Sequence, residues 1–80
     1  MSTKLHVHRL PSSTTDSELQ RLFEEVGRVV NCDVVTDGTT RMSKAVGFVE
    51  MATEEEARSA IEQLNGKELV GRVIQVSAGA

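Results

Sequence analysis

One pattern occurs twice in this chain and restricts its fold more than any other feature: a Thr-x-x-Glu sequence opens an amphipathic stripe that ends at a glycine. The first copy runs from Thr15 to Gly27 and the second from Thr53 to Gly66. Thr-x-x-Glu is the capping box that satisfies backbone N–H groups at a helix start, and glycine is common just past a helix end. Between these signals, apolar residues recur at the spacing of one helix face. The sequence therefore predicts two helices, the first of about eleven residues.

Four segments around these helices have the period-two alternation of β-strands, namely residues 4–10, 29–35, 45–51 and 72–76. In the first segment, Leu5 and Val7 fall on one face, and His6 and His8 fall on the other. Apolar helix stripes and apolar strand faces can bury one another in two layers. We therefore expect an α+β fold of βαββαβ order, a two-layer sandwich with a four-stranded antiparallel sheet, both helices on one face and the other face open to solvent.

The size of the chain limits it to one domain. With 80 residues, we expect residues 1–80 to form a single domain with a core spanning about 4–77. Cys32 is the only cysteine, which excludes an intrachain disulfide and a CxxC pair. No segment has the length of a signal-peptide apolar region or a membrane span. We therefore expect an intracellular, cytoplasmic protein, nuclear if its source is eukaryotic, that does not contact membranes.

Two strand segments resemble the signatures of the RNA-recognition-motif (RRM) family. Residues 5–10 occupy the position of the RNP2 signature, and residues 44–51 that of RNP1, the K/R-G-F/Y-G/A-F-V-x-F/Y pattern. The direct matches to RNP1 are Lys44, Gly47, Phe48 and Val49. Residues 47–51 and the end of the second helix are similar to the small single-domain bacterial members. The resemblance implies a ferredoxin-like fold and binding of single-stranded RNA, with single-stranded DNA as a further candidate ligand.

The resemblance also implies where such a ligand binds, although two of the three stacking positions lack the usual aromatic residue. Phe48 keeps its aromatic ring, whereas His6 and Val46 replace the aromatic residues of the pattern. We expect bases to stack on Phe48 and His6 and phosphates to contact Lys44 and Arg41. The expected RNA-binding residues are His6, His8, Arg41, Lys44, Val46, Phe48, Gln75 and Ser77, of which His8, Gln75 and Ser77 would offer hydrogen bonds to base edges.

The charge of the chain argues against strong RNA binding. The formal net charge is -3, whereas phosphate contacts normally come from clustered lysine and arginine. Most acidic residues fall on the predicted helices, away from the open sheet face, so we expect weak, salt-dependent binding rather than none. The alternative is a protein-interaction or homodimerisation domain that has lost RNA binding, because Val35, Val46 and Phe48 would lie exposed on the sheet.

Enzymatic activity and metal binding are not expected. His6 and His8 form an H-x-H pair on one strand face, but no third ligand is near them in the sequence. Arg9 is followed by Leu-Pro-Ser-Ser rather than by a glycine-rich phosphate loop. No cofactor is implied by any segment.

Overall fold

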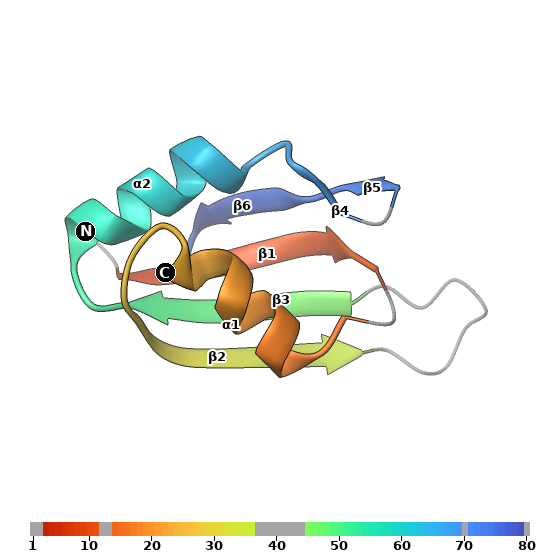
Figure 1. Ribbon diagram of the computed structural model, residues 1–80, viewed down its shortest axis with the longest axis horizontal. Coiled ribbons are helices and arrows are strands. Elements are labelled where there is room, and N and C mark those ends of the chain that lie inside the picture. Colours follow the sequence, from red (N-terminus) through yellow and green to blue (C-terminus); the bar gives the residue numbers. More distant parts are fainter. Residues whose placement is uncertain (1–2, 12–13, 37–44, 70, 80) are drawn as a thin grey trace.

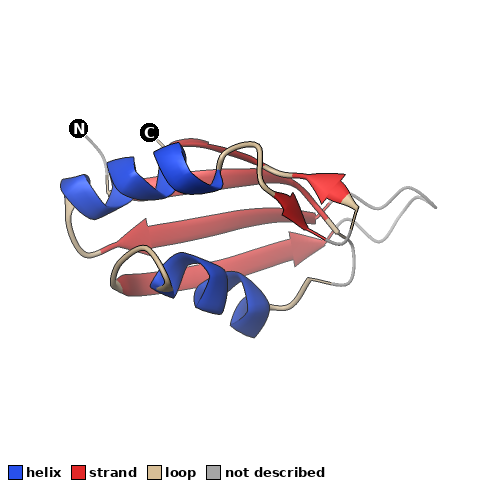
Figure 2. Cartoon of the chain, turned by 45° about the horizontal axis from the view of Figure 1, so that its top comes forward, coloured by secondary structure: helices blue, strands red, loops and turns tan. Residues whose placement is uncertain are grey.

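The computed structural model describes residues 3–11, 14–36, 45–69 and 71–79. Both helices cover one face of a four-stranded antiparallel sheet with the strand order β2-β3-β1-β6, which confirms the expected fold (Figures 1 and 2). A short two-stranded sheet, β4-β5, lies beside it. The elements are β1 (Lys4–Leu10), α1 (Asp16–Glu24), β2 (Val29–Thr36), β3 (Ala45–Met51), α2 (Glu54–Leu64), β4 (Glu68–Leu69), β5 (Arg72–Val73) and β6 (Gln75–Ala78).

The hydrophobic core lies between the helical layer and the sheet. Every strand of the four-stranded sheet packs side chains against it, those of β2 being only partly buried, and both helices contribute their apolar stripes. Its fully buried members are Leu5, Val7, Leu10, Leu19, Phe23, Val49, Met51, Ala57, Ala60, Leu64, Ile74 and Val76. In the described part of the chain, no helix lies on the opposite sheet face (Figure 2), and its side chains include the exposed His8, Phe48 and Gln75.

Both helices begin at the predicted threonines. Thr15 Oγ1 accepts a hydrogen bond from Glu18 N, and Thr53 Oγ1 accepts one from Glu56 N, each at 3.2 Å. The first helix is shorter than predicted, with 9 residues, because the chain leaves it at Glu25 and forms a turn in which Val26 N and Gly27 N both donate hydrogen bonds to Phe23 O. In the described part of the chain, no helix has the length and apolar character needed to cross a membrane.

Side chains at the helix ends also cover the two edge strands of the sheet. Asp16 Oδ1 accepts a hydrogen bond from Val34 N on β2 at 2.8 Å, and Asn65 Oδ1 accepts one from Val76 N on β6 at 3.1 Å. Unpaired N–H groups on edge strands invite pairing with other chains. These two bonds satisfy one such group on each edge and fix the helices relative to the sheet.

A β-bulge interrupts β1 near its end. Val7 pairs with Gly47 and Leu10 with Ala45, so β1 uses one more residue than β3 over this interval. Arg9 takes up the extra residue with a left-handed backbone, φ 62°. Because of the bulge, Leu10 turns into the core and is completely buried, whereas strict alternation would have left it on the open face.

The predicted fourth strand, residues 72–76, is divided in two. Arg72 and Val73 form β5, which pairs with β4 in a separate hairpin, and β6 begins only at Gln75. Gly71 supports the hairpin turn with φ 78°, a conformation that glycine adopts without a steric penalty. Ile74 and Val76 nevertheless both point into the core, where they are buried.

Candidate nucleic-acid interface

Two rows of side chains cross the open face of the sheet. The strand register aligns Asp33, Phe48, His6 and Ser77 across β2, β3, β1 and β6 in the first row. The second row aligns Val35 with Val46 and His8 with Gln75. Six of the predicted site residues, His6, His8, Val46, Phe48, Gln75 and Ser77, are thus gathered on one surface. The other two, Arg41 and Lys44, lie outside the described residues.

The first row contains two aromatic rings in contact. The centroids of His6 and Phe48 are 5.1 Å apart, with an angle of 87° between the ring planes. This edge-to-face arrangement is favourable for two rings. It also means that one base cannot lie flat on both rings at once. Phe48 is 43% exposed and His6 is half-buried, so Phe48 offers the larger surface.

Acceptor groups surround Phe48. Asp33 lies directly opposite Phe48 in the register, and both side chains are exposed. Asn31 Nδ2 donates a hydrogen bond to Glu50 Oε1 at 3.1 Å, which orients that carboxylate on the same face. A hollow of about 310 Å³ includes these residues together with His6 and with Lys4, which lies opposite Glu50 in the register. The carboxylates repel phosphates but can accept hydrogen bonds from the amino groups of bases.

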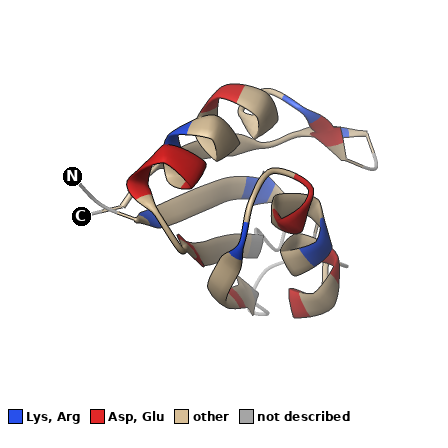
Figure 3. Ribbon diagram, turned by 60° about the vertical axis from the view of Figure 1, so that its left-hand side comes forward, with Lys and Arg blue, Asp and Glu red and all other residues tan. Residues whose placement is uncertain are grey.

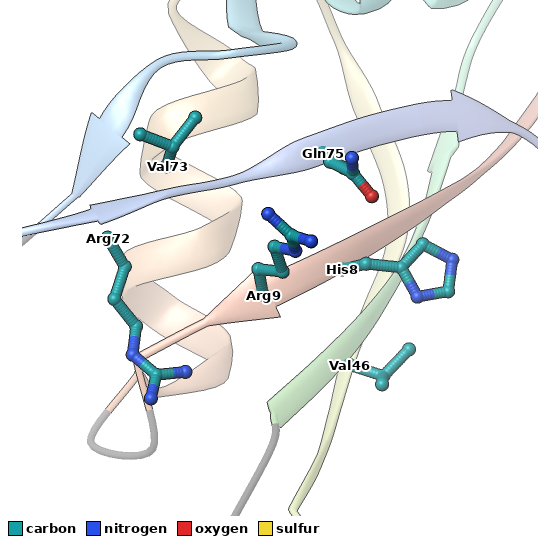
Figure 4. A pocket seen from close by; sticks show the side chains of 6 residues that line it. All are labelled: His8, Arg9, Val46, Arg72, Val73 and Gln75. Atoms are coloured by element: carbon teal, nitrogen blue, oxygen red, sulfur yellow. The ribbon is translucent and has the colours of Figure 1, made fainter.

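A second, larger hollow lies at the end of the sheet where β1 approaches the β4-β5 hairpin. It measures about 750 Å³ and is lined by His8, Arg9, Val46, Arg72, Val73 and Gln75 (Figure 4). Arg9 and Arg72 were not among the RNA-binding residues expected from the sequence. Leu10 is apolar at a position where strict alternation would leave it on the open face. This departure was the sequence signal for the bulge, and the bulge places Arg9 beside the second hollow.

The acidic residues are concentrated on the helical layer. The first turn of α2 holds Glu54, Glu55 and Glu56, and the first turn of α1 holds Asp16 and Glu18, as Figure 3 shows in red. These positions are favourable because the N-terminal end of a helix is positive. Most of the negative charge is therefore separated from the open face by the sheet and the core.

Cys32 lies on the core side of β2 and is half-buried. Its Sγ donates a hydrogen bond to Asp16 O at 3.6 Å. Burial raises the pKa of the Cys32 thiol to about 11, and the charges of Asp16 and Asp33 act in the same direction. Among the described residues, no three His, Cys, Asp or Glu side chains are grouped so that they could hold a metal ion.

Comparison with known proteins decides the family. The family model for the RNA recognition motif matches residues 5–75, which is most of the chain. The chain belongs to the RNA recognition motif family. Among solved structures, the Rna15 RRM with bound RNA (GU) matches with a TM-score of 0.87 and 28% identity, covering 100% of this chain and 85% of that one.

Relatives with higher identity occur in plants. The chloroplastic 29 kDa ribonucleoprotein B of Nicotiana sylvestris is 45% identical over 76 residues, which are 95% of this chain and 26% of that protein. The mitochondrial glycine-rich RNA-binding protein 4 of Arabidopsis thaliana is 42% identical over 77 residues, 96% of this chain and 57% of that protein. The chain spans about a quarter of the length of most of the curated relatives it matches. These names are those of RNA-binding proteins and ribonucleoproteins, and the matches indicate no catalytic family.

The names of the relatives contradict one expectation from the sequence. A cytoplasmic or nuclear location was expected, but the similar proteins are named as chloroplastic and, in one case, mitochondrial. That expectation rested on the lack of a recognisable address within these 80 residues. Because the chain corresponds to only part of its relatives, such a segment need not fall within it.

Proposed function

We propose that this domain binds single-stranded RNA, weakly, on the open face of its β-sheet. The observation that carries the proposal is the row formed by Asp33, Phe48, His6 and Ser77, in which two aromatic rings stand between polar side chains. Membership of the RNA recognition motif family and the names of its relatives support RNA as the ligand.

The bases stack on Phe48 and His6, and the polar groups of His8, Gln75 and Ser77 supply hydrogen bonds to base edges. Val46 adds apolar contact beside His8. Lys44 and Arg41 contact phosphates. Stacking contributes about 1–3 kcal/mol per base. Since the rings are perpendicular, each holds a different base, and two such steps amount to an affinity in the micromolar range or weaker.

The carboxylates of Asp33 and Glu50 keep the affinity low. Both lie on the face that the RNA covers, and both repel its phosphates. Linking this domain to another one would multiply the weak affinity through a high effective concentration. We infer that residues 1–80 are a single binding unit of this kind.

The test is an amide NMR titration with a pool of random RNA of eight nucleotides, at low and at moderate salt. Shifts are expected at His6, Phe48 and Gln75, and they should diminish as salt is added. The Phe48→Ala variant should lose most of them, whereas Val30→Ala, which truncates another exposed apolar side chain outside the two hollows, should behave as the wild type. If the wild type shows no shifts at millimolar RNA in low salt, the proposal is wrong.

A further inference from the structure

Arg9 has a backbone conformation that its own side chain disfavours. It is the only non-glycine residue with a positive φ in the described part of the chain. An L-amino acid is strained in this region, and glycine or asparagine is the usual solution. The bulge itself requires only a residue that tolerates positive φ. Because the Arg9 side chain is exposed, packing in the core does not explain the arginine either. Strained residues of this kind concentrate at functional sites.

The Arg9 side chain lies in the 750 Å³ hollow together with that of Arg72. Figure 4 shows the Arg9 side chain running from β1 toward β6 and the Arg72 side chain running from β5 in the opposite direction, so the two guanidinium groups line different parts of the hollow. None of the six lining residues is acidic. Glu68 lies on β4 opposite Val73 and does not line the hollow. Among the described residues, no carboxylate forms an ion pair with Arg9 or Arg72.

The hollow is continuous with the proposed RNA surface. His8 and Gln75 line it, and they form the row next to that of His6 and Phe48. Successive rows on one face of a strand are about 7 Å apart. A strand whose bases lie on Phe48 and His6 therefore brings its next phosphates to the edge of the hollow.

We propose that Arg9 and Arg72 form a basic pair, called the clamp below, that contacts backbone phosphates of single-stranded RNA where the strand leaves the sheet. Guanidinium groups suit this task because their donors match phosphate oxygens in a bidentate geometry. The clamp rests on the proposed function, since it takes the same RNA strand. It also supplies positive charge at one end of a face whose other hollow contains Asp33 and Glu50.

The strain at Arg9 gives the clamp a specific test. Arg9→Gly removes both the strain and the guanidinium, so its unfolding temperature should equal or exceed that of the wild type while its RNA affinity falls. A residue with only a structural role would not show this opposite response. Arg72→Gln removes the second cation without altering the bulge. Arg21→Gln, which removes one positive charge from the exposed side of α1, is the matched control.

Affinity for an eight-nucleotide RNA is measured by fluorescence anisotropy over a series of salt concentrations. Each clamp variant should bind roughly two- to fivefold more weakly at low salt, as expected for an exposed ion pair. The slope of log affinity against log salt should decrease by about 0.7 for each arginine removed. Arg21→Gln should leave the slope unchanged.

The outcomes separate the clamp from the proposed function. If the wild type binds, Phe48→Ala does not, and both clamp variants retain the wild-type slope, the clamp is refuted and the sheet surface stands. If the wild type binds no RNA, both proposals fail. In an NMR titration, RNA should shift the Arg9 and Arg72 signals more than inorganic phosphate at the same phosphate concentration. Equal shifts would indicate a small-anion site and refute the clamp.

Discussion

The Glu56 carboxylate joins the second helix to the connection between α1 and β2, and its removal should destabilise the domain. Glu56 Oε2 accepts a hydrogen bond from Arg28 N, and Oε1 accepts one from Thr53 Oγ1 at 3.1 Å. Glu56→Ala removes both bonds. A hydrogen bond to a charged group contributes about 1.5–3 kcal/mol. Because Glu56 is half-buried and water can replace part of the loss, we expect a decrease of about 2 kcal/mol in the free energy of unfolding.

Urea denaturation followed by circular dichroism measures this loss. In a domain of this size, each kcal/mol lost from the free energy of unfolding also lowers the unfolding temperature by about 4–8 °C, so thermal denaturation is a second readout. Glu55→Ala is the matched control, because Glu55 is an exposed neighbour in the same helical turn with the same favourable position near the helix N-terminus. Glu55→Ala should lower the free energy of unfolding by no more than about 1 kcal/mol. If the two variants are equally stable, the hydrogen bonds of Glu56 do not contribute as argued.

Three further predictions test other parts of the molecule. Asp33→Asn removes a carboxylate opposite Phe48 and should tighten RNA binding roughly two- to fivefold at low salt. The effect should disappear at high salt. Weaker binding of the variant in anisotropy measurements would contradict this prediction. The pKa of folded Cys32 is about 11 instead of 9.0, so at pH 8 the residue is thiolate in roughly a hundredth of the fraction of an ordinary thiol. Iodoacetamide should therefore label Cys32 far more slowly in the folded protein than in protein unfolded with guanidinium chloride, and equal labelling rates would refute the shift. Gly47→Ala brings a methyl group within 2.5 Å of Cδ2 of Leu19, a buried residue of α1. The substitution should lower the free energy of unfolding, measured by urea denaturation, by about 1–3 kcal/mol. Unchanged stability would show that the neighbouring core side chains move to accommodate the methyl group.

The layers and the open face could be predicted because they follow from residue periodicity. A side chain on a strand points to one of two faces, so Leu5 and His6 were assigned correctly from alternation alone. The helix starts were equally accessible, because the capping threonines satisfy backbone groups that belong to their own turn. These features depend on contacts close in the sequence.

The β4-β5 hairpin could not be predicted in the same way. Each of its strands has two residues, too few to establish a period, and the apolar residues Val73 and Ile74 run directly from one strand toward the next. Only Gly71 marked a turn, and a glycine between two apolar segments is compatible with a single strand that begins after it. Arg72 and Val73 pair with Leu69 and Glu68, and the local sequence pattern does not indicate this pairing.

The candidate site shows the same division between local and tertiary information. The sequence assigned His6, His8 and Phe48 to one face, but the perpendicular ring planes of His6 and Phe48 depend on contact between two strands. The hollow that contains Arg9 and Arg72 depends on both the bulge and the hairpin, neither of which was predicted.

If the proposed function is right, the distribution of charge over the open face explains how an acidic chain binds a polyanion. Around Phe48 the face has carboxylates, which disfavour phosphates but tolerate the amino groups of bases. At the end beyond His8 it has two arginines and no acidic lining residue. Under the proposed function, this distribution directs the bases and the phosphates of one strand to different parts of the surface. The net charge of the chain is consequently a poor guide to binding, because Coulomb interactions are screened over about 10 Å and the helical carboxylates act mainly on the other side of the sheet.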